Sequence, residues 1–226
     1  MSFSIGDKMK DVAVFTTVES LKSRLNGAGN STEFAFVPTM GALHDGHLDL
    51  VRKAFEIADQ VVVSIFVNPT QFNSQADLEN YPRTLENDIR LLKSVGDVII
   101  FAPTVSEMYP EDFKEINLEL NELENVMEGK FRPGHFYGVV NVVHRLFEIV
   151  SPEYALFGEK DFQQLAVIQR MVEELQLSVK IIPCPTVREK NGLAKSSRNQ
   201  RLNEVQLEQA LILVNTLNYA VENSKT

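Results

Sequence analysis

Two histidines lie close together in a glycine-containing segment in the first quarter of the chain. The segment reads PTMGALHDGH, and it places His44 and His47 on either side of the turn into an expected helix. A helix N-terminus presents free backbone N–H groups and the positive end of the helix dipole, so it suits phosphate groups. Imidazoles placed there can donate hydrogen bonds to phosphate oxygens as charge builds in a transition state. The types and spacing of these residues therefore indicate phosphate chemistry.

Two other interpretations of the histidine pair stay open. In the first, one histidine caps the helix and the other is buried, hydrogen-bonded and inert. In the second, the pair binds zinc. Metal-binding histidines usually lie within a helix at positions i and i+4 with a further ligand nearby, and neither Cys nor more His clusters here. The position of the pair at a strand-to-helix turn favours phosphate binding.

Two further segments offer polar side chains next to apolar runs. Asn68 and Gln71 follow the run VVVSIFV, and their amides could hydrogen-bond to hydroxyl and carboxylate groups of a small polar substrate. Asn-Pro is also a common start of a turn, which is the structural alternative. The segment FRPGHFYG offers Arg132 and His135, either for ligand contacts or as loop anchors.

Cations occur at two places where an anionic ligand would stabilise them. Lys160 and Asp161 precede an expected helix, where Asp161 could be the N-cap and Lys160 would benefit from a negative partner. The stretch 187–201 carries five basic residues in an otherwise acidic chain. Within it, Lys195–Arg198 mixes cations and hydroxyls, which suits a triphosphate and its leaving pyrophosphate. A solvated charged surface is the alternative.

These segments must be positioned by a regular scaffold, and apolar runs alternate with amphipathic stretches along the chain. The runs 34–37, 61–67, 98–101, 154–157 and 179–182 are predicted strands, and 48–59, 85–94, 139–150, 162–175 and 204–221 are predicted helices. A strand at 116–120 and a short helix at 123–129 are further candidates. Such alternation predicts an α/β fold, a mostly parallel sheet with helices on both faces. Ligands then bind beyond the carboxyl ends of the strands, where the polar loops lie.

Composition bounds the class of protein. The 226 residues are 44% hydrophobic, enough for a core, and composition changes near Pro183–Pro185, which predicts domains 1–184 and 185–226. The net charge of −9 argues against nucleic acid and anionic membranes as partners. A single cysteine, Cys184, fits a reducing compartment and a packing role. No run of about 18 apolar residues is present and the N-terminal ten residues are too polar for a signal peptide, so a cytoplasmic location is expected.

Seven motifs together resemble one family. They are PTMGALHDGH, SIFVNPTQF, YPRT, FRPGHFYGVV, FGEKDFQQL, PTVRE and SSRN, in that order, between about Phe34 and Leu202. The chain resembles the pantothenate synthetases (pantoate–β-alanine ligases) of coenzyme A biosynthesis. That family belongs to the wider group that contains the nucleotidyltransferases and the class I aminoacyl-tRNA synthetases, in which an HxGH-type loop binds ATP on a Rossmann-like sheet. The resemblance implies that pantoate attacks the α-phosphorus of ATP to give pantoyl adenylate, and that β-alanine then displaces AMP. It also implies magnesium, ATP as co-substrate and a homodimer.

The resemblance also implies roles for residues of these motifs. His44 and His47 would assist departure of pyrophosphate, and Lys160 and Arg198 would neutralise phosphate charge. Gln71 and Gln164 would hold pantoate, with Asn68 beside them. The metal ligands stay unassigned, with Asp88 in an indirect role near magnesium. The implied ATP site comprises Met40, Gly41, Ala42, Leu43, His44, Asp45, Gly46, His47, Gly158, Glu159, Lys160, Asp161, Val187, Lys195, Ser196, Ser197 and Arg198.

Two features depart from the family pattern. Lys195 stands where the family usually has methionine, and only about one helix follows Arg201, so a shortened C-terminal lobe is expected over the site. The alternatives are a related nucleotidyltransferase, which would need another basic residue near the second strand, and a nucleotide-binding protein with impaired turnover. A class I tRNA synthetase is disfavoured, because the net charge of −9 leaves no broad basic surface for tRNA.

Overall fold

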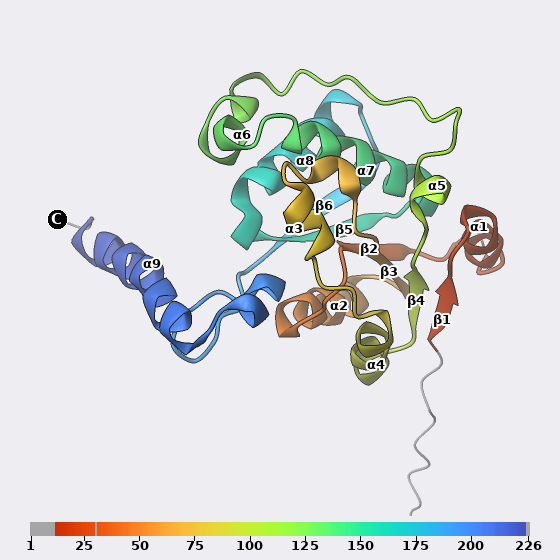
Figure 1. Ribbon diagram of the computed structural model, residues 1–226. Coiled ribbons are helices and arrows are strands. Elements are labelled where there is room, and N and C mark those ends of the chain that lie inside the picture. The colour runs from red at the N-terminus through yellow and green to blue at the C-terminus, as the bar shows by residue number, and fades with distance from the viewer. Residues whose placement is uncertain (1–11, 30, 225–226) are drawn as a thin grey trace, which may run out of the picture.

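The computed structural model describes residues 12–29 and 31–224 (Figure 1). The polar N-terminal segment and the last two residues lie outside this range. Six strands form one parallel sheet in the order β1-β4-β3-β2-β5-β6. They are β1 (Ala13–Phe15), β2 (Phe34–Thr39), β3 (Gln60–Ile65), β4 (Val98–Phe101), β5 (Tyr154–Gly158) and β6 (Lys180–Cys184). The predicted Rossmann-like α/β fold is confirmed, and the three-residue strand β1 is an addition to it.

The direction of winding reverses between β2 and β5. From β2 the chain builds outward through β3 to β4, and it then crosses back to place β5 and β6 on the other side of β2. Connections from the carboxyl ends of β2 and β5 therefore leave on opposite faces and open a crevice between them. Three predicted polar loops, those after β2, β3 and β5, lie at this end of the sheet.

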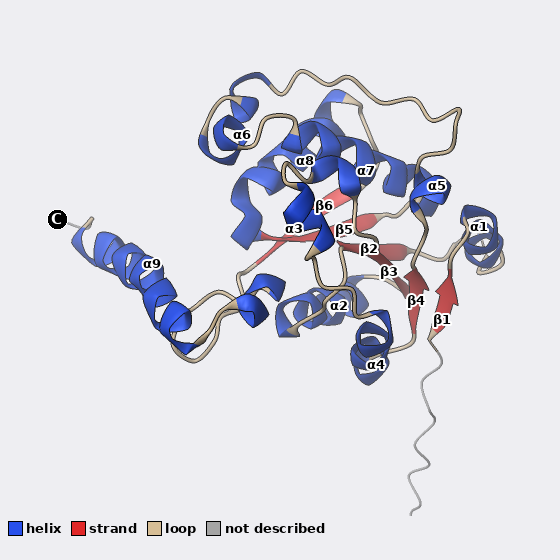
Figure 2. Ribbon diagram, in the orientation of Figure 1, coloured by secondary structure: helices blue, strands red, loops and turns tan. Residues whose placement is uncertain are grey.

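Helices cover both faces of the sheet, as predicted (Figure 2). The helices are α1 (Val18–Asn26), α2 (Asp45–Ile57), α3 (Gln75–Glu79), α4 (Leu85–Val95), α5 (Val105–Met108), α6 (Met127–Phe131), α7 (His135–Val150), α8 (Phe162–Glu174) and α9 (Glu204–Asn223). Short 3-10 turns are η1 (Pro69–Gln71), η2 (Asn121–Glu124), η3 (Glu159–Asp161) and η4 (Ser197–Arg201). Helices α1, α7 and α8 form one layer, and α2 and α4 form the other.

Two cores follow from the alternation of side chains along the strands. Phe36 points to the α7 layer, where its ring meets Phe147 edge to face at 6.3 Å. The next residue, Val37, packs into the other core with Val51 of α2. Burying each such side chain contributes about 1.5–3 kcal/mol. Cys184 lies in the second core, which agrees with a packing role.

Two local predictions were wrong. Residues 116–120 form no strand: Leu118 and Leu120 are buried in the expected alternation, but no strand lies beside them in the described part of the chain. Instead the side chain of Asn141 accepts from the Ile116 N–H at 2.8 Å. The single helix expected at 123–129 is two elements, η2 and α6, and they approach so closely that a Cβ on Gly129 would lie 2.5 Å from the Glu124 carbonyl oxygen.

The chain beyond the sheet differs in character from the rest. After β6 it forms a loop with one bridge between Arg188 and Ala194, then η4 and α9. Helix α9 projects away from the sheet (Figure 1), and it leaves large apolar side chains exposed: Val205, Ile212, Leu213, Leu217, Tyr219 and Val221. Among the described residues, no helix is both long and apolar enough to cross a membrane.

Candidate active site

A pocket of about 740 Å³ lies beyond the carboxyl ends of β2 and β5. Residues from each predicted loop line it: Met40, His44, His47, Asn68, Gln71, Lys160, Asp161, Gln164, Ser196, Ser197 and Arg198. The remaining predicted residues belong to the same loops but do not line the pocket: Gly41, Ala42, Leu43, Asp45, Gly46, Gly158, Glu159, Val187 and Lys195. The structure thus brings together side chains that lie more than a hundred positions apart in the sequence.

The buried carboxylate of Asp88 stabilises the backbone of the histidine turn (residues 40–47). Gly41 and Ala42 have φ angles of 80° and 49°, a left-handed conformation that is unfavourable for alanine. Asp88 of α4 stabilises it by accepting hydrogen bonds from the backbone N–H groups of Ala42 at 3.0 Å and Leu43 at 2.8 Å. A Cβ on Gly41 would lie 3.1 Å from Asp88 Oδ2, so the carboxylate fits closely under the turn.

Backbone contacts also fix the two imidazoles. His44 is the N-cap of α2, and its Nδ1 accepts from the Gly46 N–H at 3.1 Å. His47 Nδ1 accepts from the His44 N–H at 3.3 Å, and the two ring centroids are 4.0 Å apart. With Nδ1 acting as acceptor in each ring, the proton of the neutral imidazole lies on Nε2. The capping interpretation of His44 is therefore correct, and it leaves Nε2–H free as a donor.

The surroundings keep both histidines neutral near pH 7. Loss of solvation, followed by the neighbouring His44 and Lys160, lowers the pKa of His47 to about 3. Loss of solvation, followed by Lys160 and Lys195, also lowers the pKa of His44. No group of three His, Cys, Asp or Glu side chains suited to a metal ion occurs within the described ranges. The zinc interpretation thus has no third ligand.

Asn68 and Gln71 form an amide pair after β3. Asn68 Nδ2 donates to Gln71 Oε1 at 3.1 Å and to the Gly138 carbonyl at 3.2 Å, while its Oδ1 accepts from the Tyr109 hydroxyl at 2.8 Å. The Asn68 amide is therefore used within the protein. Because Asn68 donates to Gln71 Oε1, it fixes which end of the Gln71 amide is the nitrogen. The Nε2 end lies 3.2 Å from Met40 Sδ.

Arg132 and His135 anchor this amide loop. His135 Nδ1 lies 2.8 Å from the Gln71 carbonyl oxygen, and Arg132 Nη2 donates to the same oxygen at 3.2 Å. Both residues also line the pocket. Of the two interpretations available from the sequence, the structure supports the loop anchor.

The loop after β5 presents one cation and one free amide. Lys160 Nζ is 3.4 Å from Asp161 Oδ1, and Asp161 makes no side-chain capping bond to α8 although it occupies the N-cap position. Gln163 and Gln164 differ sharply. Both line the pocket, but Gln163 donates to the carbonyls of Leu123 and Val126, whereas the Gln164 amide has no hydrogen-bond partner in the described structure.

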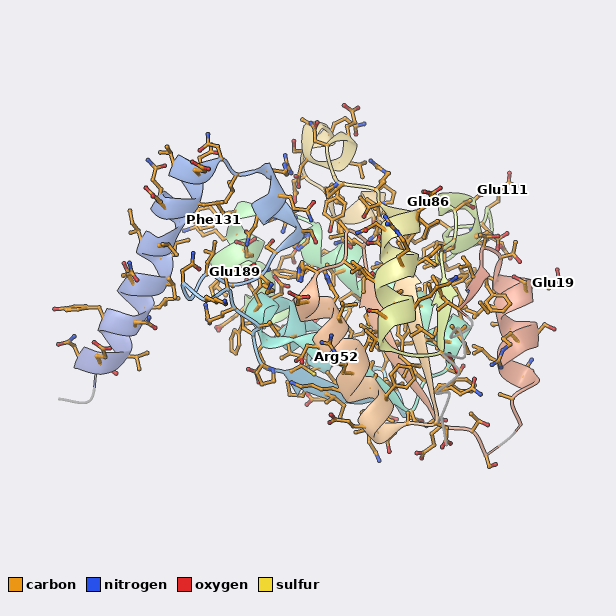
Figure 3. The ribbon with its side chains drawn as sticks, turned by 90° about the horizontal axis from the view of Figure 1, so that it is seen from below. Glu19, Arg52, Glu86, Glu111, Phe131 and Glu189 are labelled. Carbon is orange, nitrogen blue, oxygen red and sulfur yellow. The ribbon has the colours of Figure 1, made fainter. Side chains whose placement is uncertain are left out.

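The loop around η4 closes the site from the other side. Ser197 Oγ donates to the Ala42 carbonyl at 2.9 Å, which ties this loop to the histidine turn. Lys195 lies outside the pocket, where its ammonium is 2.6 Å from Asp45 Oδ2 and 3.3 Å from Glu189 Oε1 (Figure 3 labels Glu189). Two carboxylates thus neutralise the residue that departs from the family pattern.

Asp77 and Tyr81 are among the pocket residues that the sequence analysis did not predict. Asp77 of α3 forms ion pairs of 2.9 Å with Arg198 and with Arg201, and the ring of Tyr81 lies 5.5 Å from the Arg198 guanidinium carbon. The only signal was the motif YPRT, which names Tyr81 but not its role. Asp77 lies in a polar stretch with no distinguishing pattern.

The fold and the site together define a Rossmann-like α/β protein with a histidine pair at the turn from β2 into α2. The comparisons narrow this class. The family model described as pantoate-beta-alanine ligase matches residues 13–226. The pantothenate synthetase of Christiangramia forsetii is 52% identical over 185 residues, which are 81% of this chain and 65% of that relative. The chain belongs to the pantoate–β-alanine ligase family, and it spans just under two thirds of that relative's length.

Solved structures agree with this assignment. The pantoate–β-alanine ligase of Francisella tularensis, complexed with beta-gamma ATP and beta-alanine, has a TM-score of 0.87 and 41% identity, covering 92% of this chain and 80% of its own. The pantothenate synthetase of Thermus thermophilus has a TM-score of 0.89 and 46% identity, covering 94% of this chain and 76% of its own.

Proposed function

We propose that this protein condenses pantoate with β-alanine to form pantothenate, using ATP and releasing AMP and pyrophosphate through a pantoyl-adenylate intermediate. The observation that carries the proposal is one pocket, at the reversal of strand order, that gathers the histidine turn, the Gln71 loop, Lys160 and Arg198. The ligands of the Francisella tularensis relative, an ATP compound and beta-alanine, support the same substrates here.

In the proposed complex the triphosphate lies along the histidine turn. The neutral Nε2–H groups of His44 and His47 donate to phosphate oxygens, while Lys160 and Arg198 supply positive charge from facing walls. The wider ATP site is that expected from the sequence: Met40 to His47, Gly158 to Asp161, Val187 and Lys195 to Arg198. Because Lys195 is already paired with two carboxylates, we assign it to holding the loop.

Pantoate would lie against the amides of Gln71 and Gln164, with Asn68 keeping Gln71 in its orientation. A pantoate carboxylate oxygen attacks the α-phosphorus, and the bond from that phosphorus to pyrophosphate breaks. The amine of β-alanine then attacks the acyl carbon, AMP leaves, and the amine loses a proton. The protein contributes alignment of the reactants and stabilisation of charge on the leaving group.

Magnesium fits this site as a partner of ATP. Mg²⁺ usually binds through substrate phosphates, waters and at most one or two carboxylates. Both oxygens of Asp88 already accept from backbone N–H groups, and no three-ligand cluster exists in the described residues. We therefore propose that the ion is held by the phosphates, where it neutralises their charge. The division into a binding domain, 1–184, and a small lobe, 185–226, and the homodimer are parts of the same proposal.

The test is AMP formation from ATP, magnesium and pantoate, with and without β-alanine. We expect AMP release that depends on β-alanine and that falls on the order of 10²–10³-fold in His47→Ala, since one transition-state donor is lost. His144→Ala is the matched control, because His144 lies on α7 away from the pocket. Binding of ATP without AMP formation under any condition would overturn the ligase and favour a nucleotide-binding protein with impaired turnover.

A further inference from the structure

We propose that Asp77 is a positioning residue that aims Arg198 at the nucleotide by holding the turn η4 against α3. This inference rests on the proposed function, in which Arg198 neutralises phosphate charge. Asp77 and Arg198 are 121 positions apart, and both line the pocket. Asp77 is assigned no contact with the substrates and acts through the arginine.

Asp77 forms ion pairs with both Arg198 and Arg201, and we call this three-residue cluster the bracket. Its Oδ2 accepts from Arg198 Nη2 at 2.9 Å, and its Oδ1 accepts from Arg201 Nη1 at 2.9 Å. One ion pair therefore reaches the first turn of η4 and the other reaches its last residue. A short 3-10 turn has few hydrogen bonds of its own, so such external contacts determine where it lies.

Helix α3, which carries Asp77, is fixed at both ends by hydrogen bonds. The backbone N–H of Asp77 donates to the cap residue Ser74 of α3 at 3.3 Å. Arg83 fastens the other end of α3, since its guanidinium donates to the carbonyls of Leu78 at 3.1 Å and Tyr81 at 3.2 Å. Tyr81 is 5% exposed, and its ring lies 5.5 Å from the Arg198 guanidinium carbon. Arg198 is thus held by a carboxylate and an aromatic ring on one segment.

The charges favour positioning over competition with the ligand. One carboxylate faces two guanidinium groups, so the cluster keeps a net positive charge. Arg198 spends one terminal nitrogen on Asp77, and a guanidinium has five N–H donors, so donors remain for a phosphate. The side chains of Asp77, Arg198 and Arg201 are 30%, 46% and 42% exposed, and ion pairs at such exposure contribute little to folding stability. The bracket therefore sets geometry.

The kinetic test is a double-mutant cycle with Asp77→Ala and Arg198→Ala. We expect Asp77→Ala to raise the KM for ATP about tenfold with a smaller change in kcat, and to add little in the Arg198→Ala background, since it acts through that arginine. Asp77→Asn should resemble Asp77→Ala. Glu79→Gln is the matched control, because Glu79 lies on the same helix and its side chain contacts Gln75, away from both arginines. Additive effects, or tighter ATP binding in Asp77→Ala, would overturn the proposal.

A second measurement does not depend on turnover. Hydrogen exchange without substrates reports two backbone amides of this turn. Asn199 in η4 donates to the Ser196 carbonyl at 3.0 Å, and Leu202, the C-cap of η4, donates to the Asn199 carbonyl at 3.1 Å. Exchange of these amides should be faster in Asp77→Ala and unchanged in Glu79→Gln, at equal melting temperatures. Unchanged exchange in Asp77→Ala would refute the bracket. If the wild type forms no AMP while exchange changes as expected, the proposed function fails and the bracket stands.

Discussion

At the scale of single residues, the histidine turn shows how backbone contacts decide what a side chain can do. Each imidazole accepts a backbone N–H at Nδ1, and that contact, together with a lowered pKa, leaves a neutral ring with Nε2–H as donor. A positive imidazolium would attract phosphate more strongly, but it would also need solvation that the site does not supply. In the proposed complex, the positive charge therefore comes from Lys160 and Arg198.

Gly46→Ala should disable the turn without unfolding the protein. A Cβ at this position would lie 2.9 Å from His44 Cε1 and 3.0 Å from its Nδ1, so the imidazole must leave the position in which it accepts from the Gly46 N–H. We expect kcat for AMP formation to fall about 10–100-fold, as for a misplaced catalytic group. Gly27→Ala is the control, since its nearest neighbour would be 3.4 Å away. Equal activity of the two variants would contradict the assigned position.

The lowered pKa of His47 predicts a pH dependence of stability. Between pH 6.5, the ordinary value, and about 3, the unfolded chain binds a proton at this residue that the folded chain does not. Above pH 6.5, His47 should therefore not lower the free energy of unfolding. As the pH falls from 6.5 toward 3, the free energy of unfolding should decline. Urea titrations of the wild type and His47→Gln at several pH values measure this. The variant should lose less stability on acidification, and parallel curves would refute the shift.

The sequence predicted residues whose chemistry is visible in a motif and missed those that act by position. His44, His47 and Arg198 occur in recognisable patterns, and the structure places all three in the pocket. Asp77 matters only because α3 packs opposite η4, which no local pattern encodes. Lys195 has the right charge, but its placement beside Asp45 and Glu189 depends on the path of the loop between β6 and η4.

At the scale of elements, the sequence predicted the location of the site better than the edges of the helices. Five of the six strands follow from their apolar runs, and the carboxyl ends of parallel strands meet at one edge of a sheet. Helix α2 begins at Asp45, one to three residues before the start expected around Gly46 to Leu48, because His44 caps it. The segment 116–120 has the right alternation, but a strand also requires a neighbour, which a side-chain pattern does not report.

The contact between α7 and η1 makes a prediction about substrate selectivity. A Cβ on Gly138 would lie 2.6 Å from the Thr70 carbonyl oxygen and 2.9 Å from the Gln71 nitrogen, so Gly138→Ala must push η1 away from α7. Since Gln71 is the proposed pantoate contact, KM for pantoate should rise about tenfold, roughly the effect of one weakened hydrogen bond. KM for ATP serves as the internal control. An equal rise for both substrates would indicate general loosening instead.

At the scale of the whole molecule, helices α1, α2, α4, α7 and α8 pack on the sheet, whereas α9 projects away from it. Leu213 and Leu217 are 71% and 58% exposed, whereas Val214, one residue along, is 6% exposed and packs by Gly192. Several large exposed apolar side chains on one helix favour association. Val214 is the one buried residue of α9 among the described residues, so the helix packs on the rest of the protein through the side that carries Val214.

Replacing the exposed leucines should leave stability intact. Leu213→Gln with Leu217→Gln removes apolar surface that nothing in the described structure covers, so the free energy of unfolding should change by less than about 0.5 kcal/mol per site. Binding of a hydrophobic dye should decrease. Val214→Gln is the matched comparison, since it buries a polar group and should loosen the helix, seen as faster proteolysis of α9. Strong destabilisation by the double leucine change would contradict the exposed placement.

The pairing of β2 with β5 also orders events during synthesis. Phe36 lies beside Ala155 in the sheet, yet β3 and β4 are made between them. While the ribosome has released only the first four strands, the histidine turn can form, but the two loops that carry Lys160 and Arg198 do not yet exist, and one edge of β2 is unpaired. Open strand edges invite association with other nascent chains. In the proposed function, a nucleotide would therefore meet its complete site only after β5 and η4 have been made, and the edge of β2 stays open to association until β5 emerges.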